Sequence, residues 1–206
     1  FQQLGSKMQM PQIATPDTDK FMVPIPCPDN PKKSLEIQAE IVRILDTFTE
    51  LTTELTTELT IRKKQYNHYR DQLLSFEDGE VEWKTLGELA KNLDSKRKPI
   101  TSGLREPGYI PYYGASGIVD YVKDYIFDGD YLLVSDDGAN LLARNTPIAF
   151  SISGKNWVNN HAHVLEFGTY HERRFIEFYL NNIDLTPYIS GAAQPKLNKK
   201  NLESIS

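Results

Sequence analysis

The chain has 206 residues, a mass of 23.5 kDa, 23 basic and 28 acidic side chains, and a formal net charge of −5. Its length and its hydrophobic content of 39% are typical of a globular protein with one or two domains and exclude a disordered chain. No apolar run approaches the roughly 18 residues that cross a bilayer, and the single cysteine, Cys27, excludes an internal disulfide, so we expect a cytoplasmic protein without a membrane partner.

The charge is distributed unevenly along the chain. Residues 1–80 carry a net charge of −4, whereas residues 81–206 carry only −1. Because binding depends on the local electrostatic field, the acidic average does not exclude a nucleic-acid partner. The basic residues of the second part gather in two places, at Lys96, Arg97, Lys98 and Arg105 and at Lys196, Lys199 and Lys200.

Residues 34–76 contain no glycine or proline and are predicted to form one long helix. Apolar residues recur in steps of three and four, which is the rhythm of a coiled coil, with one extra step of four at Leu55 and the polar Arg62 as a break. A single apolar stripe needs a partner helix, and we expect a second copy to supply it in an antiparallel homodimer. The packing residues of this seam are Ile41, Ile44, Phe48, Leu51, Leu55, Leu59, Tyr66, Tyr69 and Leu73.

Inside this helix a Thr-Glu-Leu unit repeats every four residues, starting at Thr49, Thr53 and Thr57. One interpretation is a sequence slip that a coiled coil tolerates. The other is a length adjuster, because each added tetrad lengthens a helix by about 6 Å. The residues alone favour the slip.

From residue 77 onward the pattern predicts a compact domain of short strands and a few helices, which gives the whole chain an α+β class with a long coiled-coil helix. Helices are expected at residues 86–93 and 172–182. Strands are expected at residues 109–113, 118–122, 131–135, 147–153 and 163–167.

The two ends of the chain resemble each other. Pro11 and Phe21 match Pro195 and Ile205 at a constant offset of 184 residues. This match suggests that the chain begins at the end of one unit and ends at the same point of the next.

Two patterns permit a metal-dependent nuclease or another hydrolase. Glu82 and Lys84 have the E-x-K shape of many nucleases, and His161 and His163 alternate so that a strand would place them on one face. However, the acidic residues near Glu82 flank a helix terminus, and a polar turn before a strand is the commoner explanation of the histidines. The chain has no phosphate-binding P-loop and no tetrapeptide of an adenine methyltransferase, and we expect no metal and no catalytic residue.

Other patterns favour DNA binding. Residues 96–103 form a basic loop, and residues 111–117 combine aromatic rings with small residues. We expect phosphate contacts from Lys96, Arg97, Lys98, Arg105, Lys196, Lys199 and Lys200. We expect contacts near bases from Tyr112, Tyr113, Ser116, Asn140, Arg144, Asn159, Asn160 and His161.

Five stretches of the sequence resemble specificity subunits of type I restriction-modification enzymes. They are residues 36–46, preceded by Ile25-Pro26, and residues 69–76, 110–118, 159–164 and 191–197, supported by residues 83–88, and they follow one another in the order of that family. The resemblance implies a DNA-recognition protein that reads one half of a bipartite site, with the long helix setting the spacing between half-sites. It also favours the length-adjuster interpretation of the tetrads.

The resemblance further implies four regions. Residues 1–33 would be the tail of a preceding recognition domain, 34–76 the spacer helix, 77–187 a target-recognition domain and 188–206 the start of the next conserved region. The expected partners are double-stranded DNA and the methyltransferase and restriction subunits, which would hold S-adenosylmethionine and ATP. No cofactor is expected on this chain. The alternatives are the nuclease above and a coiled-coil assembly adaptor without its own ligand.

Overall fold

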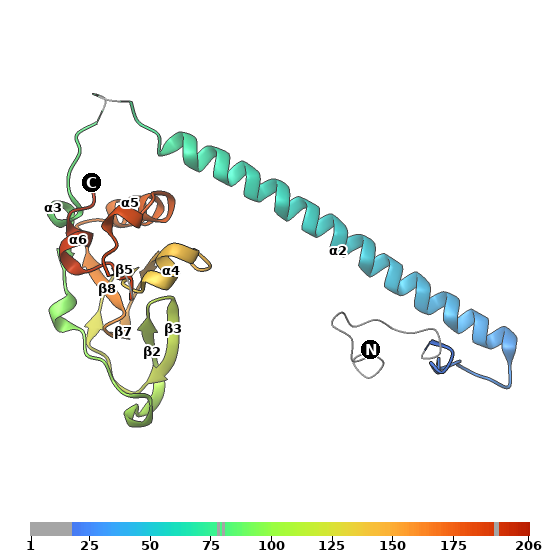
Figure 1. Cartoon of the computed structure of the whole chain (residues 1–206). Helices are drawn as coiled ribbons and strands as arrows, with labels where there is room; N and C mark the ends of the chain where they lie inside the picture. The colour runs from blue at the N-terminus through green and yellow to red at the C-terminus, as the bar shows by residue number, and fades with distance from the viewer. Residues whose placement is uncertain (1–17, 78, 80, 192–193) are drawn as a thin grey trace. The chain divides into compact units, whose positions relative to one another are not determined.

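The computed structural model describes residues 18–77, 79, 81–191 and 194–206. The chain divides into two compact units, Phe1–His68 and Tyr69–Ser206. The expected α+β class is confirmed, because a long helix precedes a unit of short strands arranged in two sheets (Figure 1). Within the described part of the chain, no helix combines the length and the apolarity that membrane crossing requires.

The long helix, α2, spans Pro31–Leu73 and has 43 residues. It starts three residues earlier than predicted, because proline is tolerated in the first turn, where no backbone N–H needs a helical acceptor. The side chain of Asn30 caps this start by accepting a hydrogen bond of 3.1 Å from the N–H of Lys33. The helix also ends earlier than predicted, so Phe76 lies outside it.

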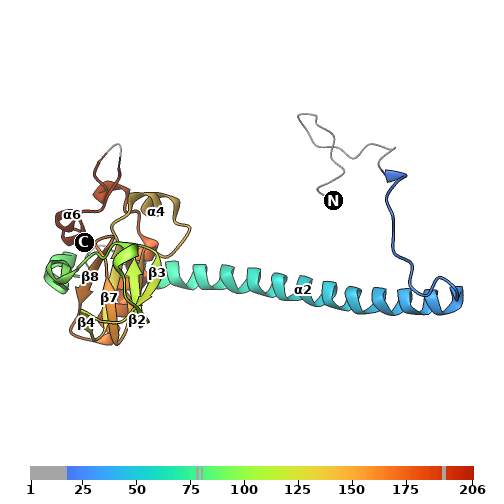
Figure 2. The same cartoon turned by 90° about the horizontal axis from the view of Figure 1, so that it is seen from below.

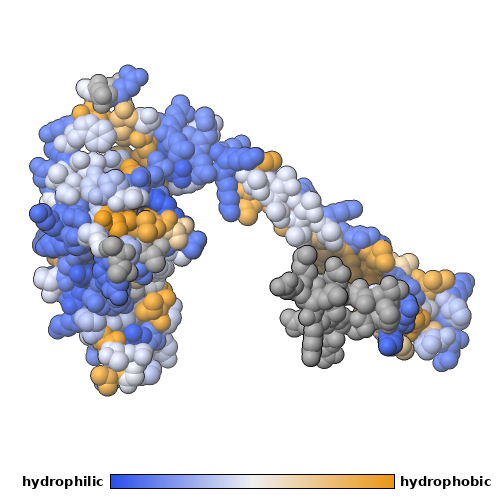
Figure 3. Space-filling model, viewed as in Figure 1, coloured by the Kyte–Doolittle hydropathy of each residue, from blue (hydrophilic) through white to orange (hydrophobic). Residues whose placement is uncertain are grey.

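The predicted apolar seam of α2 is exposed along its whole length; for example, Phe48 is 61% exposed. Orange side chains are visible along α2 in Figure 3. The hydroxyl groups of the tetrad residues Thr49, Thr53 and Thr57 each donate a hydrogen bond of 2.8 Å to the carbonyl four residues earlier. The helix therefore satisfies its own threonines, which explains how it accommodates them despite their modest helix propensity.

The second unit contains two four-stranded sheets (Figure 2). The first has the order β1-β8-β5-β6 and is antiparallel throughout; the second has the order β3-β2-β7-β4, with β2 and β7 parallel. The strands are β1 (Lys91–Asn92), β2 (Pro107–Gly114), β3 (Gly117–Val122), β4 (Phe127–Asp128), β5 (Tyr131–Ser135), β6 (Ala149–Ile152), β7 (Lys155–Val158) and β8 (Ala162–Glu166).

Strand β5 lies in the middle of the fold and is buried on both faces. Leu132 and Val134 belong to one apolar cluster, whereas Leu133 belongs to the other, as the two-residue period of a strand requires. The first cluster packs the sheet against helices and the second joins the two sheets. The continuous run of apolar residues at 131–134 reflects this double burial.

Helices pack against one face of the first sheet. They are α3 (Leu86–Leu89), α4 (Gly138–Ala143), α5 (Tyr170–Asn182) and α6 (Lys199–Glu203), with short 3-10 turns at Asp94–Lys96, Ser102–Leu104 and Thr186–Tyr188. A capping box between Thr169 and Glu172 fixes the start of α5, two residues before its predicted start. Leu197, Leu202 and Ile205 are fully buried in the first cluster, so residues 194–206 pack as part of this unit.

Candidate nucleic-acid interface

Arg97 joins the basic loop to the turn between β7 and β8. Its guanidinium donates a hydrogen bond of 2.8 Å to the carbonyl oxygen of Ala162 and lies 3.1 Å from a carboxylate oxygen of Asp94. Both side chains are largely buried. Arg97 therefore holds two loops together, and its predicted phosphate contact stays a prediction.

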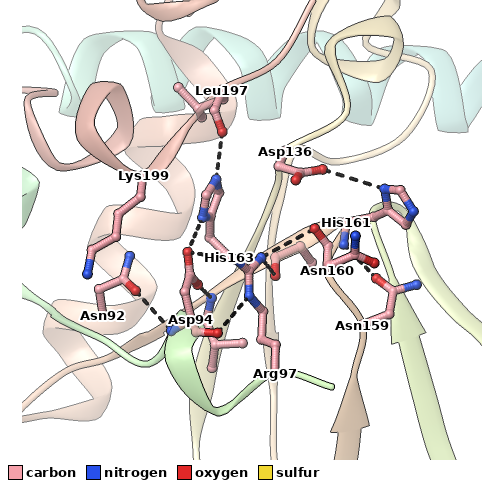
Figure 4. A network of polar contacts seen from close by, with 12 residues as sticks. Asn92, Asp94, Arg97, Asp136, Asn159, Asn160, His161, His163, Leu197 and Lys199 are labelled. Carbon is pink, nitrogen blue, oxygen red and sulfur yellow. Dashed lines mark hydrogen bonds and ion pairs between the residues drawn. The ribbon is translucent and has the colours of Figure 1, made fainter. Parts of the chain in front are cut away.

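His163 extends this network to the C-terminal segment (Figure 4). Its Nδ1 lies 2.5 Å from Oδ2 of Asp94, and its Nε2 lies 2.6 Å from the carbonyl oxygen of Leu197. Both neighbours are acceptors, so both ring nitrogens donate at once only when the imidazole is protonated. Burial alone would raise the pKa of Asp94, but the hydrogen bond and charge of His163, with help from Val164 and Arg97, hold that pKa below its usual value.

Asp136 forms a second junction, at the end of β5. Its backbone N–H donates to the carbonyl of His161 at 3.1 Å, and its own carbonyl accepts from the N–H of Leu197 at 3.2 Å. Its carboxylate lies 3.9 Å from Nδ1 of His161 and 3.8 Å from the ammonium group of Lys196. The turn between β7 and β8 and the segment around residue 196 therefore meet at this aspartate (Figure 4).

The turn between β2 and β3 lies beside the same residues. The N–H of Asn159 donates to the carbonyl of Tyr113 at 3.0 Å. A Cβ atom at Gly114 would lie 3.0 Å from the side chain of Val119 and 3.4 Å from the amide nitrogen of Asn159, so only glycine fits there without displacing a neighbour. The loops at residues 94–98, 114–117 and 194–199 are thus each connected to the turn at residues 159–161, the last of them through Asp136.

Several of the predicted DNA-binding residues are exposed on or next to these loops and keep their side chains directed to solvent. With the residues that the structure describes, Lys196 and Lys199 form long ion pairs, of 3.8 Å with Asp136 and 3.6 Å with Glu203. Tyr113 is half-buried. The exposed residues of the predicted set are Lys96, Lys98, Ser116, Arg144, Asn160, His161, Lys196, Lys199 and Lys200. Their contacts with DNA stay predictions.

The structure corrects the roles of Tyr112 and Arg105. Tyr112 is 1% exposed, and its hydroxyl accepts a hydrogen bond of 2.9 Å from the N–H of Ile100. The guanidinium of Arg105 lies over the Tyr112 ring at 4.4 Å and pairs with Asp120 at 2.9 Å. A buried ring cannot stack on a base, so both residues instead hold the loop before β2 on the sheet.

The side chains of three more residues predicted to contact bases form hydrogen bonds within the protein, and their base contacts stay predictions. The carbonyl oxygen of the Asn140 side chain accepts from the hydroxyl of Thr146 at 2.8 Å, which closes the loop after α4. Arg144 donates to the carbonyl of Asn181 at 3.1 Å, at the C-terminal end of α5, where a cation is favourable. Asn159 is 9% exposed, and its side chain accepts from the N–H of His161 at 2.8 Å.

The structure gives no support to the nuclease alternative. Glu82 and Lys84 pair with each other at 3.2 Å on the surface. His163 is buried with both ring nitrogens engaged, whereas His161 lies before β8 and is exposed, so the two histidines do not share an accessible face. No group of three potential metal ligands occurs among the residues that the structure describes.

Sequence reasoning missed Asp94 and Asp136, the two carboxylates that connect the loops. A local signal existed for Asp136, because it directly follows the apolar run of β5. No local signal singled out Asp94, whose partner His163 is 69 residues away.

Comparisons with known proteins point to one family. Residues 79–206 match the model of the type I restriction modification DNA specificity domain. The type I restriction enzyme EcoprrI specificity subunit of Escherichia coli is 42% identical over 208 residues, covering 95% of this chain and 51% of that protein. The EcoR124I/EcoR124II specificity subunit of the same species is 59% identical over 112 residues, covering 50% of this chain and 27% of that protein. A putative type I specificity subunit of Mycoplasma pneumoniae is 30% identical over 187 residues, covering 83% of this chain and 71% of that protein.

A solved structure has the same fold. The type I restriction-modification S subunit from M. genitalium superposes with a TM-score of 0.71 and 18% identity, covering 98% of this chain and 55% of that one. The chain spans about half the length of the EcoprrI subunit, and about half that of this solved subunit.

Proposed function

The chain belongs to the family of type I restriction-modification DNA specificity domains, and from that premise we propose that its second unit reads one half of a bipartite DNA site. The relatives it matches are named specificity subunits of type I restriction enzymes. The proposed ligand of this chain is accordingly double-stranded DNA.

The connected loops carry this proposal. Asp94, Asp136 and His163 tie together segments that are far apart in the sequence, so the loops that bear the exposed polar residues are held in one arrangement. Rigid placement of polar groups is what reading base edges requires. The exposed lysines at 96, 98, 196, 199 and 200 supply the phosphate contacts that orient a duplex.

We assign no catalytic step to this chain. The proposed partners are a methyltransferase subunit and a restriction subunit, which would hold S-adenosylmethionine and ATP and perform methyl transfer and cleavage. The near-neutral charge of residues 81–206 supports such an assembly, because a weakly cationic reader gains DNA affinity from basic partners.

The long helix is proposed to pair in antiparallel fashion with the same helix of a second copy. Its apolar seam is exposed from Ile41 to Leu73, and 43 residues give a rod of about 65 Å. Such a rod separates two recognition units by a fixed distance. A C2 pair of identical readers would recognise an inverted repeat, since the symmetry of the protein is mirrored in its site.

Selection from randomised duplexes tests this function. The chain is assembled with its methyltransferase subunit and used to retain duplexes from a library. We expect two identical short motifs in inverted orientation, separated by a gap of constant length. Retention without any sequence preference would contradict the proposal.

A further inference from the structure

An apolar hollow opens in the surface of the second unit, away from the connected loops. It has a volume of about 210 Å³ and is lined mainly by Phe76, Val81, Trp83, Leu89, Phe175 and Tyr179. The rings of Phe76 and Phe175 lie 6.5 Å apart, and those of Phe175 and Tyr179 are stacked at 6.4 Å. Ser206 lies at its edge, and its carbonyl oxygen accepts a hydrogen bond of 3.2 Å from the hydroxyl of Tyr179. None of the residues of the connected loops lines this hollow.

An exposed apolar segment precedes α2. Residues 21–26 read Phe-Met-Val-Pro-Ile-Pro; Met22 is 87% exposed and Val23 is 64% exposed. Two prolines within six residues favour an extended, polyproline-like backbone, which loses little conformational entropy on docking. Segments of this kind dock into grooves lined by aromatic rings. The segment and the hollow are therefore both apolar and complementary in chemistry.

The internal sequence match places this segment next to the hollow. At the offset of 184 residues, Phe21 corresponds to Ile205 and Met22 corresponds to Ser206. Ile205 is buried in the unit and Ser206 lines the hollow. Val23 to Pro26 thus follow the position in the repeat that touches the hollow, and this register points to the same occupant as the chemistry does.

Chain length decides which copy supplies the segment. Ile25 is six residues before the start of α2 and Phe76 is three residues after its end, so the two connections together span at most about 30 Å. The helix between them is about 65 Å long. The segment of one chain cannot reach the hollow of the same chain, whereas antiparallel pairing brings the start of one helix beside the end of its partner.

We propose that residues 21–26 of one copy dock into the apolar hollow of a second copy and close both ends of the paired helices. This inference rests on the antiparallel pairing proposed above. The docked segment forms an interface separate from the helix seam. This interface fixes the recognition unit of one copy to the start of the partner's long helix.

Cysteine cross-linking between differently tagged chains tests the proposal. All chains carry Cys27→Ser, so that only the introduced cysteines react. In the test mixture, chains with Val23→Cys are combined with chains with Leu89→Cys. In the control mixture, Leu104→Cys replaces Leu89→Cys, because Leu104 is an exposed position of the same unit outside the hollow. We expect at least about tenfold more cross-linked heterodimer with Leu89→Cys than with the control. Equal yields in a sample that sediments as a dimer would overturn the docking and leave the helix pairing intact.

A second measurement does not depend on the pairing. The double variant Val23→Asp and Ile25→Asp removes the apolar character of the chain's own segment. A Trp157→Phe substitution in the same chain leaves Trp83, which lines the hollow, as its fluorescent reporter. A synthetic peptide of residues 19–27 with serine in place of Cys27 should shift the emission of Trp83 to the blue and saturate. The absence of a shift in Trp83 emission would overturn the proposal, as would a shift that occurs only when the methyltransferase subunit is added. A chain that binds the peptide but stays monomeric would support this segment as the ligand of the hollow. It would overturn the proposal that a second copy provides the segment.

Discussion

The ring of His163 lies with its Nδ1 2.5 Å from Oδ2 of Asp94, and both side chains are more than nine-tenths buried. This contact joins residues that are 69 positions apart and, through Leu197, fixes the C-terminal segment to the strands. The pair determines how the loops of the proposed interface are arranged, although neither side chain is exposed to a duplex.

The first prediction concerns this pair. Asp94→Asn removes the carboxylate from a buried ion pair, which destabilises a protein by about 3 kcal/mol and should lower the melting temperature by about 10 °C at pH 7. In the folded state, the pKa of Asp94 lies below the ordinary value of an aspartate. Its contribution is therefore present above that value and is lost as the pH falls through the folded-state pKa. Calorimetry between pH 7 and pH 2.5 should show a flatter acid limb for the variant.

Asp124→Asn is the matched control, because Asp124 is an exposed aspartate of the same unit. Its melting temperature should stay within about 2 °C of the parent, as for most surface substitutions. Equal destabilisation by both variants would contradict the role of the buried pair.

The second prediction concerns phosphate contacts. The double variant Lys96→Ala and Lys98→Ala should weaken DNA binding equally for all sequences and reduce the slope of log affinity against log salt by about 2, close to 0.9 per lost contact. Fluorescence anisotropy of the assembled complex at several salt concentrations measures this. Lys123→Ala is the control. Lys123 pairs with Glu106 at 2.9 Å, and both residues lie at the ends of β2 and β3 that are opposite to the turn joining these strands. A slope unchanged by the double variant would remove both lysines from the interface.

The third prediction concerns base recognition. The side chain of His161 is 53% exposed beside Asp136. His161→Ala should relax discrimination at one base pair of the half-site by about 1–3 kcal/mol and leave the others unchanged. Competition between duplexes that differ at single positions measures this. Tyr112→Phe, which removes a buried hydroxyl, should cost about 1 kcal/mol of stability and leave the bases read unchanged.

The fourth prediction concerns the tetrads. Deleting Thr53 to Thr56 shortens α2 by about 6 Å, which corresponds to one to two base pairs at about 3.4 Å each. The gap between half-sites should shrink by that amount while the half-site sequences stay the same. Mapping the preferred gap of the deletion variant in its full complex measures this, and an unchanged gap would mean that the helix is not the ruler.

Much of the fold could be predicted because local pattern and tertiary structure agree. The helix at 31–73, the strand at 131–135 and the helix at 170–182 are long or strongly apolar, and each lies within three residues of its predicted bounds. Strand β7, at Lys155–Val158, was missed because four residues carry no readable period, and its place is set by pairing with β2 and β4. The helix expected at 86–93 ends at Leu89 because Lys91 and Asn92 pair with β8.

The candidate site was harder to predict than the fold. Residue type alone does not separate an arginine that binds phosphate from one that holds a loop. Arg97, Arg105 and Arg144 all donate to partners within the protein, whereas the neighbouring lysines stay exposed. That difference depends on distant carbonyl and carboxylate groups that only the folded chain brings within reach.

Genome-wide mapping of methylated bases tests the central claim most directly. The chain is expressed with its methyltransferase subunit in a host that lacks other methylation. We predict a split motif, with two short specific blocks in inverted orientation separated by a non-specific gap, in which substitution of His161 alters the same position of both blocks. A continuous motif, or methylation without sequence preference, would contradict the account.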